Sequence, residues 1–90
     1  MKVIAKSIDV IAWFTEAGEP SPIRFRMKNE DQSTTIIKVD KVIFKEKEKL
    51  AGNPMLVFRC QSMIDKINKI YELKYELQTC KWTLFKMLKQ

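Results

Sequence analysis

The chain has 90 residues, with 17 Lys or Arg against 11 Asp or Glu, which gives a formal charge of +6. This length allows one domain with a modest core, so we treat residues 1–90 as a single domain that has little room for a deep catalytic cleft. A hydrophobic fraction of 46% and only two glycines exclude a disordered or fibrous chain.

The first predicted strand covers residues 7–15, where apolar residues occupy both faces. Ile11 and Trp13 lie on one face. The opposite face carries Ile8, Val10, Ala12 and Phe14. A strand of this kind is central or covered on both sides. Residues 16–22 are dense in turn formers and form a loop.

The second strand is predicted at residues 23–28 and the third at residues 34–45, separated by a polar turn. Within the third strand the apolar phase changes near Asp40 and Lys41, which indicates a bulge or a sharp bend. Residues 45–51 break the apolar alternation, and we expect a solvated connector there, such as one exposed helical turn, with a ligand-binding loop as the alternative.

The last three strands show the clearest pattern. Residues 55–64, 71–77 and 80–84 keep their apolar faces in phase when they are joined as a meander. A turn at Gln78 and Thr79 predicts a set of cross-strand pairs in the final hairpin. These are Leu77 with Cys80, Tyr75 with Trp82, Leu73 with Leu84 and Glu76 with Lys81.

The preceding turn extends that register to the cysteines. A two-residue turn at Asp65 and Lys66 places Cys60 opposite Tyr71 and Phe58 opposite Leu73, and a four-residue turn keeps the same faces. Cys60 and Cys80 are then about 20 Å apart along the strands, too far for a disulfide, so we expect two free thiols.

These patterns predict an all-β fold, an antiparallel meander of five to six strands. The preferred architecture is a small bent barrel, SH3-like or OB-like, and the alternative is a two-layer sandwich. The choice depends on whether the first strand meets the last.

The sequence holds little catalytic potential. It contains no histidine, and two isolated glycines and two distant cysteines make neither a phosphate loop nor a zinc site. Asp9 and Asp40 are the only carboxylates of interest, and Cys60 falls on the core face without a base beside it. We therefore expect a protein that is not an enzyme and needs no metal or cofactor.

A row of cations is the first functional feature. Arg24, Arg26 and Lys28 project from one side of one strand, and Lys38 and Lys41 could lie near them. Such a row suits phosphate groups and makes nucleic acid the alternative partner. It is also compatible with an ordinary outer face whose arginines pair with acids. Because most aromatic residues fall on the inward face, a base-stacking platform is disfavoured.

Apolar residues on the outward face are the second feature. They are Ile11, Trp13, Ile70, Phe85 and Met87. If the first and last strands are neighbours, these side chains could form one exposed patch that contacts another protein or a second copy of the chain. Alternatively, a bulge near Leu84 returns Phe85 to the core, or the N-terminal segment covers the patch.

The location follows from what is missing. The N-terminal stretch is short and interrupted by lysine, unlike a secretory signal, and no apolar run approaches the ~20 residues of a membrane span. We expect a cytoplasmic protein without a membrane partner.

Four stretches, residues 23–30, 38–44, 49–62 and 71–87, resemble short bacterial proteins to which no activity is attached. The resemblance implies a stand-alone bacterial all-β domain and transfers no functional residue. From the residues themselves, the function we expect is a non-catalytic binding module, making protein contacts or a homodimer, with nucleic-acid binding as the alternative.

Overall fold

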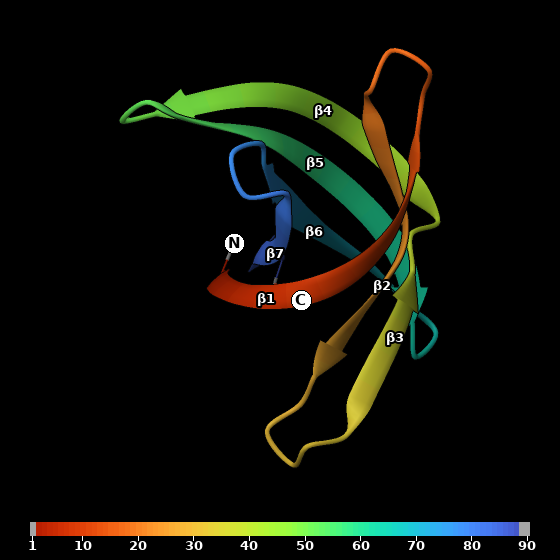
Figure 1. The fold of residues 1–90 in the computed structure, drawn as a ribbon. Coiled ribbons are helices and arrows are strands. Elements are labelled where there is room, and N and C mark those ends of the chain that lie inside the picture. The colour runs from red at the N-terminus through yellow and green to blue at the C-terminus, as the bar shows by residue number, and fades with distance from the viewer. Residues whose placement is uncertain (1, 89–90) are drawn as a thin grey trace.

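A computed structural model describes residues 2–88 as one curled antiparallel sheet (Figure 1). It has seven strands in the spatial order β3-β2-β1-β7-β6-β5-β4. Their bounds are Lys2–Phe14 (β1), Pro20–Lys28 (β2), Thr34–Lys38 (β3), Lys41–Leu50 (β4), Asn53–Ile64 (β5), Ile67–Glu76 (β6) and Lys81–Met87 (β7). The all-β class and the barrel-like curl are confirmed. The number of strands is seven where five to six were expected, because the expected third strand is divided in two. Residues 2–88 contain no helix that could cross a membrane.

β1 is shared between two neighbouring strands. Residues 2–8 pair with β7, and residues 9–14 pair with β2. The first and last strands therefore meet, and the sheet is continuous from β3 to β4. Figure 1 shows the result as a half-barrel, in which β1 sweeps around one side and the β4–β5 hairpin arches over the other.

The bend predicted near Asp40 is confirmed, and it divides the expected third strand into β3 and β4. The Val39 N–H donates to the Ile23 carbonyl at 2.8 Å, and the Asp40 N–H donates to the Gln61 carbonyl at 3.0 Å. These bonds hold the linker against β2 on one side and β5 on the other. A bulge follows at Ile43, where the register of β4 on β5 shifts.

The expectation of a solvated connector or helical turn at residues 45–51 is wrong, because β4 continues to Leu50. Every residue from Phe44 to Leu50 has a partner in β5. The strand returns through Ala51 and Gly52, both at positive φ (51° and 79°), as a tight two-residue hairpin requires. Pairing with a buried neighbour has overridden the helical preference of Lys and Glu.

The registers of the last two hairpins are confirmed by their pairs. Cys60 lies opposite Tyr71, and Asp65 and Lys66 form a two-residue turn with φ of 51° and 66°. In the final hairpin, Tyr75 lies opposite Trp82, Leu73 opposite Leu84 and Glu76 opposite Lys81, as predicted.

The turn of that final hairpin was predicted wrongly. Leu77 and Cys80 do not face each other, because residues 77–80 form a four-residue loop. Cys80 adopts a φ of 61° and donates its N–H to the Glu76 carbonyl at 2.8 Å. Gln78 and Thr79 are poor residues for a two-residue turn, whereas a longer loop needs only one residue at positive φ.

The core fills the concave side of the sheet. Alternate residues of β5, β6 and β7 supply most of it, and β2 and β3 complete it with Phe25 and Ile37. The aromatic residues interlock: the Tyr75 and Trp82 rings lie 4.7 Å apart, and Phe25 packs edge-on against Tyr71 with centroids at 5.5 Å. These tilted and edge-on contacts add to the stabilisation that burial alone gives.

One buried hydrogen-bond network links the β3 edge of the sheet to β5 and β6. The Ser62 Oγ donates to the Lys38 carbonyl of β3 at 2.6 Å, so its only proton is used. The Tyr71 hydroxyl, 2.6 Å away, must then donate to Ser62. Burial raises the pKa of Tyr71 well above its usual range, which keeps this donor protonated.

Replacement of Ser62 measures how much this hydrogen-bond network contributes to stability. Ser62→Ala leaves the Tyr71 hydroxyl and the Lys38 carbonyl without their shared partner, and should lower the free energy of unfolding by about 1–3 kcal/mol. With Tyr71→Phe added, the loss should be smaller than the sum of the two single losses. Urea denaturation of the wild-type protein, the two single variants and the double variant measures this. Strictly additive losses would contradict the hydrogen-bond network.

The two cysteines occupy opposite environments. Both thiols are free, with Cys60 fully buried and Cys80 exposed in the β6–β7 loop. Burial raises the pKa of Cys60 to about 12, so its thiolate is negligible at neutral pH.

A maleimide at pH 7 should therefore modify Cys80 alone in the native protein and both cysteines after unfolding. Mass spectrometry of the intact protein and its peptides checks this. Equal labelling of both thiols in the native state, or a mass two protons low, would refute the assignment.

Candidate binding surface

The pairing of β1, β2 and β3 brings the two sequence features onto one surface. Ile11 lies opposite Arg24, which in turn lies opposite Lys38. In the next row Asp9 lies opposite Arg26, and Arg26 lies opposite Ile36. Residues paired across strands project to the same side of a sheet. We call this surface the β1–β3 outer face: Asp9, Ile11, Trp13, Arg24, Arg26, Lys28, Ile36 and Lys38.

Large apolar side chains stand exposed on this face. The exposed fractions are 62% for Ile11, 68% for Trp13 and 64% for Ile36. Strand alternation explains their direction, since Val10, between Ile11 and Asp9, and Ile37, beside Ile36, point to the core instead. Ile11 and Trp13 follow each other on the outer side of β1, and Ile36 lies on β3 with β2 between them. Large apolar side chains gathered on one exposed face are typical of an interface.

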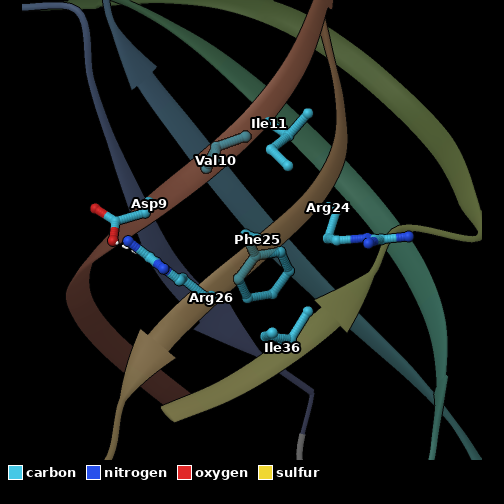
Figure 2. A pocket seen from close by; sticks show the side chains of 7 residues that line it. All are labelled: Asp9, Val10, Ile11, Arg24, Phe25, Arg26 and Ile36. Atoms are coloured by element: carbon cyan, nitrogen blue, oxygen red, sulfur yellow. Dashed lines mark hydrogen bonds and ion pairs between the residues drawn. The ribbon is translucent and has the colours of Figure 1, made fainter.

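A shallow groove of about 390 Å³ crosses the middle of the face. Its walls include Ile11, Ile36, Arg24 and Arg26. Figure 2 shows Arg26 reaching toward Asp9, whereas Arg24 extends in the other direction, away from that carboxylate. The groove therefore offers an apolar centre with a cation on each side.

The charge of the face is positive because its single acid is already paired. The Arg26 Nε donates to the Asp9 Oδ2 at 2.9 Å, and both side chains are largely exposed, so this ion pair adds under about 1 kcal/mol to stability. Within residues 2–88, neither Arg24 nor Lys28 nor Lys38 has a carboxylate partner. In the expected basic row on this face, Arg26 therefore has a carboxylate partner, whereas Arg24, Lys28 and Lys38 have none among residues 2–88.

Lys41 does not belong to this face by strand pairing. It follows the bend, in β4, and lies opposite Gln61 of β5.

The other predicted interface residues lie elsewhere. Phe85 is the extra residue of a bulge in β7, half-buried on the outer side with the Lys74 Nζ 3.7 Å above its ring. The bulge turns Met87 inward, where it packs against the core opposite Tyr71. Ile70 is half-buried, and its backbone carbonyl accepts the Leu88 N–H at 2.8 Å.

Ile70, Phe85 and Met87 are separated from Ile11 and Trp13 because the two halves of β1 pair with different strands. β7 pairs with residues 2–8 of β1, whereas Ile11 and Trp13 lie in the half that pairs with β2. The first and last strands are neighbours as expected, but the five apolar residues do not form one patch.

Sequence reasoning missed Ile36, which completes the apolar part of the β1–β3 outer face. Ile36 and Ile37 are adjacent, so one of them had to face outward in any strand. That signal was present, yet only the pairing of β2 with β3 reveals that Ile36 lies beside Arg26.

The carboxylates considered for catalysis have structural roles. The Asp40 Oδ2 accepts the Met63 N–H at 2.7 Å, and Asp9 is bound to Arg26. Among residues 2–88 no three His, Cys, Asp or Glu side chains converge as metal ligands would.

Neither protein-family models nor curated proteins nor solved structures give a match to this chain. The candidate surface therefore stands on its own geometry.

The two tryptophans provide a direct test of the surface. Trp13 is exposed on a basic face and Trp82 is 8% exposed in the core. Anionic iodide should quench Trp13 fluorescence more strongly, relative to cationic caesium, than it quenches free N-acetyltryptophanamide, because the local potential concentrates anions. Trp13→Phe should remove the quenchable emission. An iodide-to-caesium ratio equal to that of the free compound would contradict a basic surrounding.

Proposed function

We propose that this protein is a non-catalytic binding module that holds an acidic protein partner on the β1–β3 outer face. The observation that carries this proposal is the coincidence, on paired strands, of exposed Ile11, Trp13 and Ile36 with the uncompensated cations Arg24 and Lys38. Neither set alone would distinguish an interface from an ordinary solvated surface.

The composition of the face supports a protein as the partner. Trp and Arg are the residues that most often dominate the energy of protein interfaces. Complete burial of an isoleucine contributes about 1.5–3 kcal/mol, and burial of the exposed part of Ile11 or Ile36, 62% and 64%, against a partner would contribute the corresponding share. Nucleic-acid backbones offer less apolar surface for two isoleucines to cover.

The charges support an acidic partner over a second copy. A two-fold dimer through this face would set a predominantly basic surface, with Arg24 and Lys38, against a copy of itself. Like charges juxtaposed at an interface oppose association, whereas an acidic partner is attracted and oriented by them. The homodimer considered from the sequence is therefore not the form we propose for this face.

Nucleic acid is the second candidate, and one observation favours it. Trp13 is an exposed aromatic ring on the same face as the open cations Arg24 and Lys38. A single strand could stack a base on Trp13 while its phosphates contact the cations.

A panel of labelled ligands separates these functions by fluorescence anisotropy. The ligands are a peptide that mixes Glu with Leu and Phe, a poly-Glu peptide of equal charge, and a 20-nucleotide thymidine strand. We expect the mixed peptide to bind most tightly. Either Ile11→Ser with Ile36→Ser, or Arg24→Glu with Lys38→Glu, should weaken it at least tenfold, whereas the matched control Lys2→Glu with Lys66→Glu should not.

Two results would overturn the proposal. If the oligonucleotide binds most tightly and the isoleucine variants leave it unchanged, the face is a nucleic-acid surface. If every acidic ligand responds equally to the control variant and to the Arg24 variant, only the net charge of the chain is acting.

A further inference from the structure

The second edge of the sheet carries a separate signal. β4 pairs with β5 alone and forms the outer margin of the arch in Figure 1. Beyond the bulge at Ile43 its ladder on β5 is regular from Phe44 to Leu50. At alternate residues of this stretch the backbone N–H and C=O groups point away from β5, where an added strand could pair with them.

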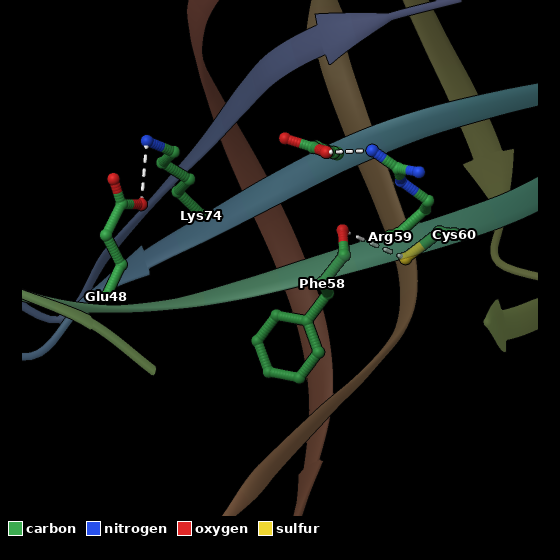
Figure 3. Close-up of polar contacts among 6 residues, drawn as sticks. Glu48, Phe58, Arg59, Cys60 and Lys74 are labelled. Atoms are coloured by element: carbon green, nitrogen blue, oxygen red, sulfur yellow. Dashed lines mark hydrogen bonds and ion pairs between the residues drawn. The ribbon is translucent and has the colours of Figure 1, made fainter. Parts of the chain in front are cut away.

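Charges along this edge are sorted by face. Lys45, Lys47 and Lys49 share the concave side of the sheet, because Lys45 lies opposite the core residue Phe58. Glu46 and Glu48 occupy the convex side, where the Lys74 Nζ binds the Glu48 carboxylate at 3.0 Å (Figure 3).

Two of the lysines remain uncompensated. The Lys45 Nζ lies 3.8 Å from the Glu19 carboxylate of the β1–β2 turn. In the part of the chain that the structure describes, Lys47 and Lys49 face no carboxylate within ion-pair distance. The concave margin of β4 is therefore a row of cations.

A second copy of the chain does not fit this edge as an antiparallel strand. In an antiparallel pair related by a two-fold axis perpendicular to the sheet, each residue meets one of the same face, and hence of the same parity. Every such register of the alternating stretch sets Lys against Lys and Glu against Glu. Like charges directly opposite each other destabilise a strand pair, so β4 is protected against pairing with itself.

The same geometry defines what the edge would accept. We propose that the edge of β4 is a docking site for an extended segment of another protein, with acidic side chains at every second position. Its backbone adds an eighth strand to the sheet, and its acids lie opposite Lys45, Lys47 and Lys49. This site lies on different residues from the β1–β3 outer face and does not depend on the function proposed there.

Three synthetic peptides and the ¹⁵N-labelled full chain test this site. The first, Thr-Glu-Val-Glu-Val-Glu-Thr, alternates acid and valine; the second has Lys in place of Glu; the third clusters the three glutamates. The alternating acidic peptide should shift amide signals of residues 44–49 and slow their hydrogen exchange, since new strand bonds form there. Lys47→Glu with Lys49→Glu should weaken it at least tenfold, whereas the matched pair Lys2→Glu with Lys66→Glu should leave it unchanged.

Each contrary result overturns the site. Equal binding of the alternating and clustered acidic peptides would show attraction without strand pairing. Shifts confined to β1, β2 and β3 would assign the peptide to the other surface. A thymidine oligonucleotide that shifts residues 44–49 as strongly would show a polyanion surface, and no shift at millimolar peptide would leave the charges as edge protection alone.

Discussion

The link between β3 and β4 is the constraint on which this architecture depends. These two strands are the opposite edges of a seven-stranded sheet, yet only Val39 and Asp40 separate them in the chain. Three trans peptide units span at most about 11 Å, whereas the edges of a flat seven-stranded sheet would lie about 29 Å apart. The sheet can satisfy both requirements only by curling until its edges approach each other. The half-barrel is thus imposed by connectivity and filled by the core.

The curl explains where the polar groups of the core are found. As β3 approaches β5, the Lys38 carbonyl turns toward the interior and accepts a hydrogen bond from Ser62, which in turn accepts one from Tyr71. At the surface of the same bend, the Asp40 side chain accepts the Met63 N–H. Left without Ser62, the partly buried Lys38 carbonyl would be costly to bury. The point of strongest curvature is therefore also the point where side chains replace the missing strand ladder.

Much of the local structure could be predicted from the sequence, because it is encoded in period-two patterns. Tyr75 with Trp82 and Cys60 with Tyr71 follow from alternation and turn position, and the phase change near Asp40 marks the bend. The second half of β4 could not be recognised, since residues 45–49 alternate between two charged types and carry no apolar phase. The candidate surface could not be predicted from the sequence for another reason. Ile11, Arg24 and Lys38 meet only through the pairing of three strands, and no local pattern reports which half of β1 pairs with β2.

The division of β1 between two partners has a consequence for how the protein is made. Residues 9–14 can pair with β2 as soon as that hairpin has left the ribosome, because the two strands are close in the chain. Residues 2–8 must wait for β7, the last strand of the sheet to be synthesised. Until then Ile4 and Ile8 have no complete core to enter. Contacts of such long sequence separation form late and slowly, so the N-terminal half of β1 is the segment most in need of protection during translation.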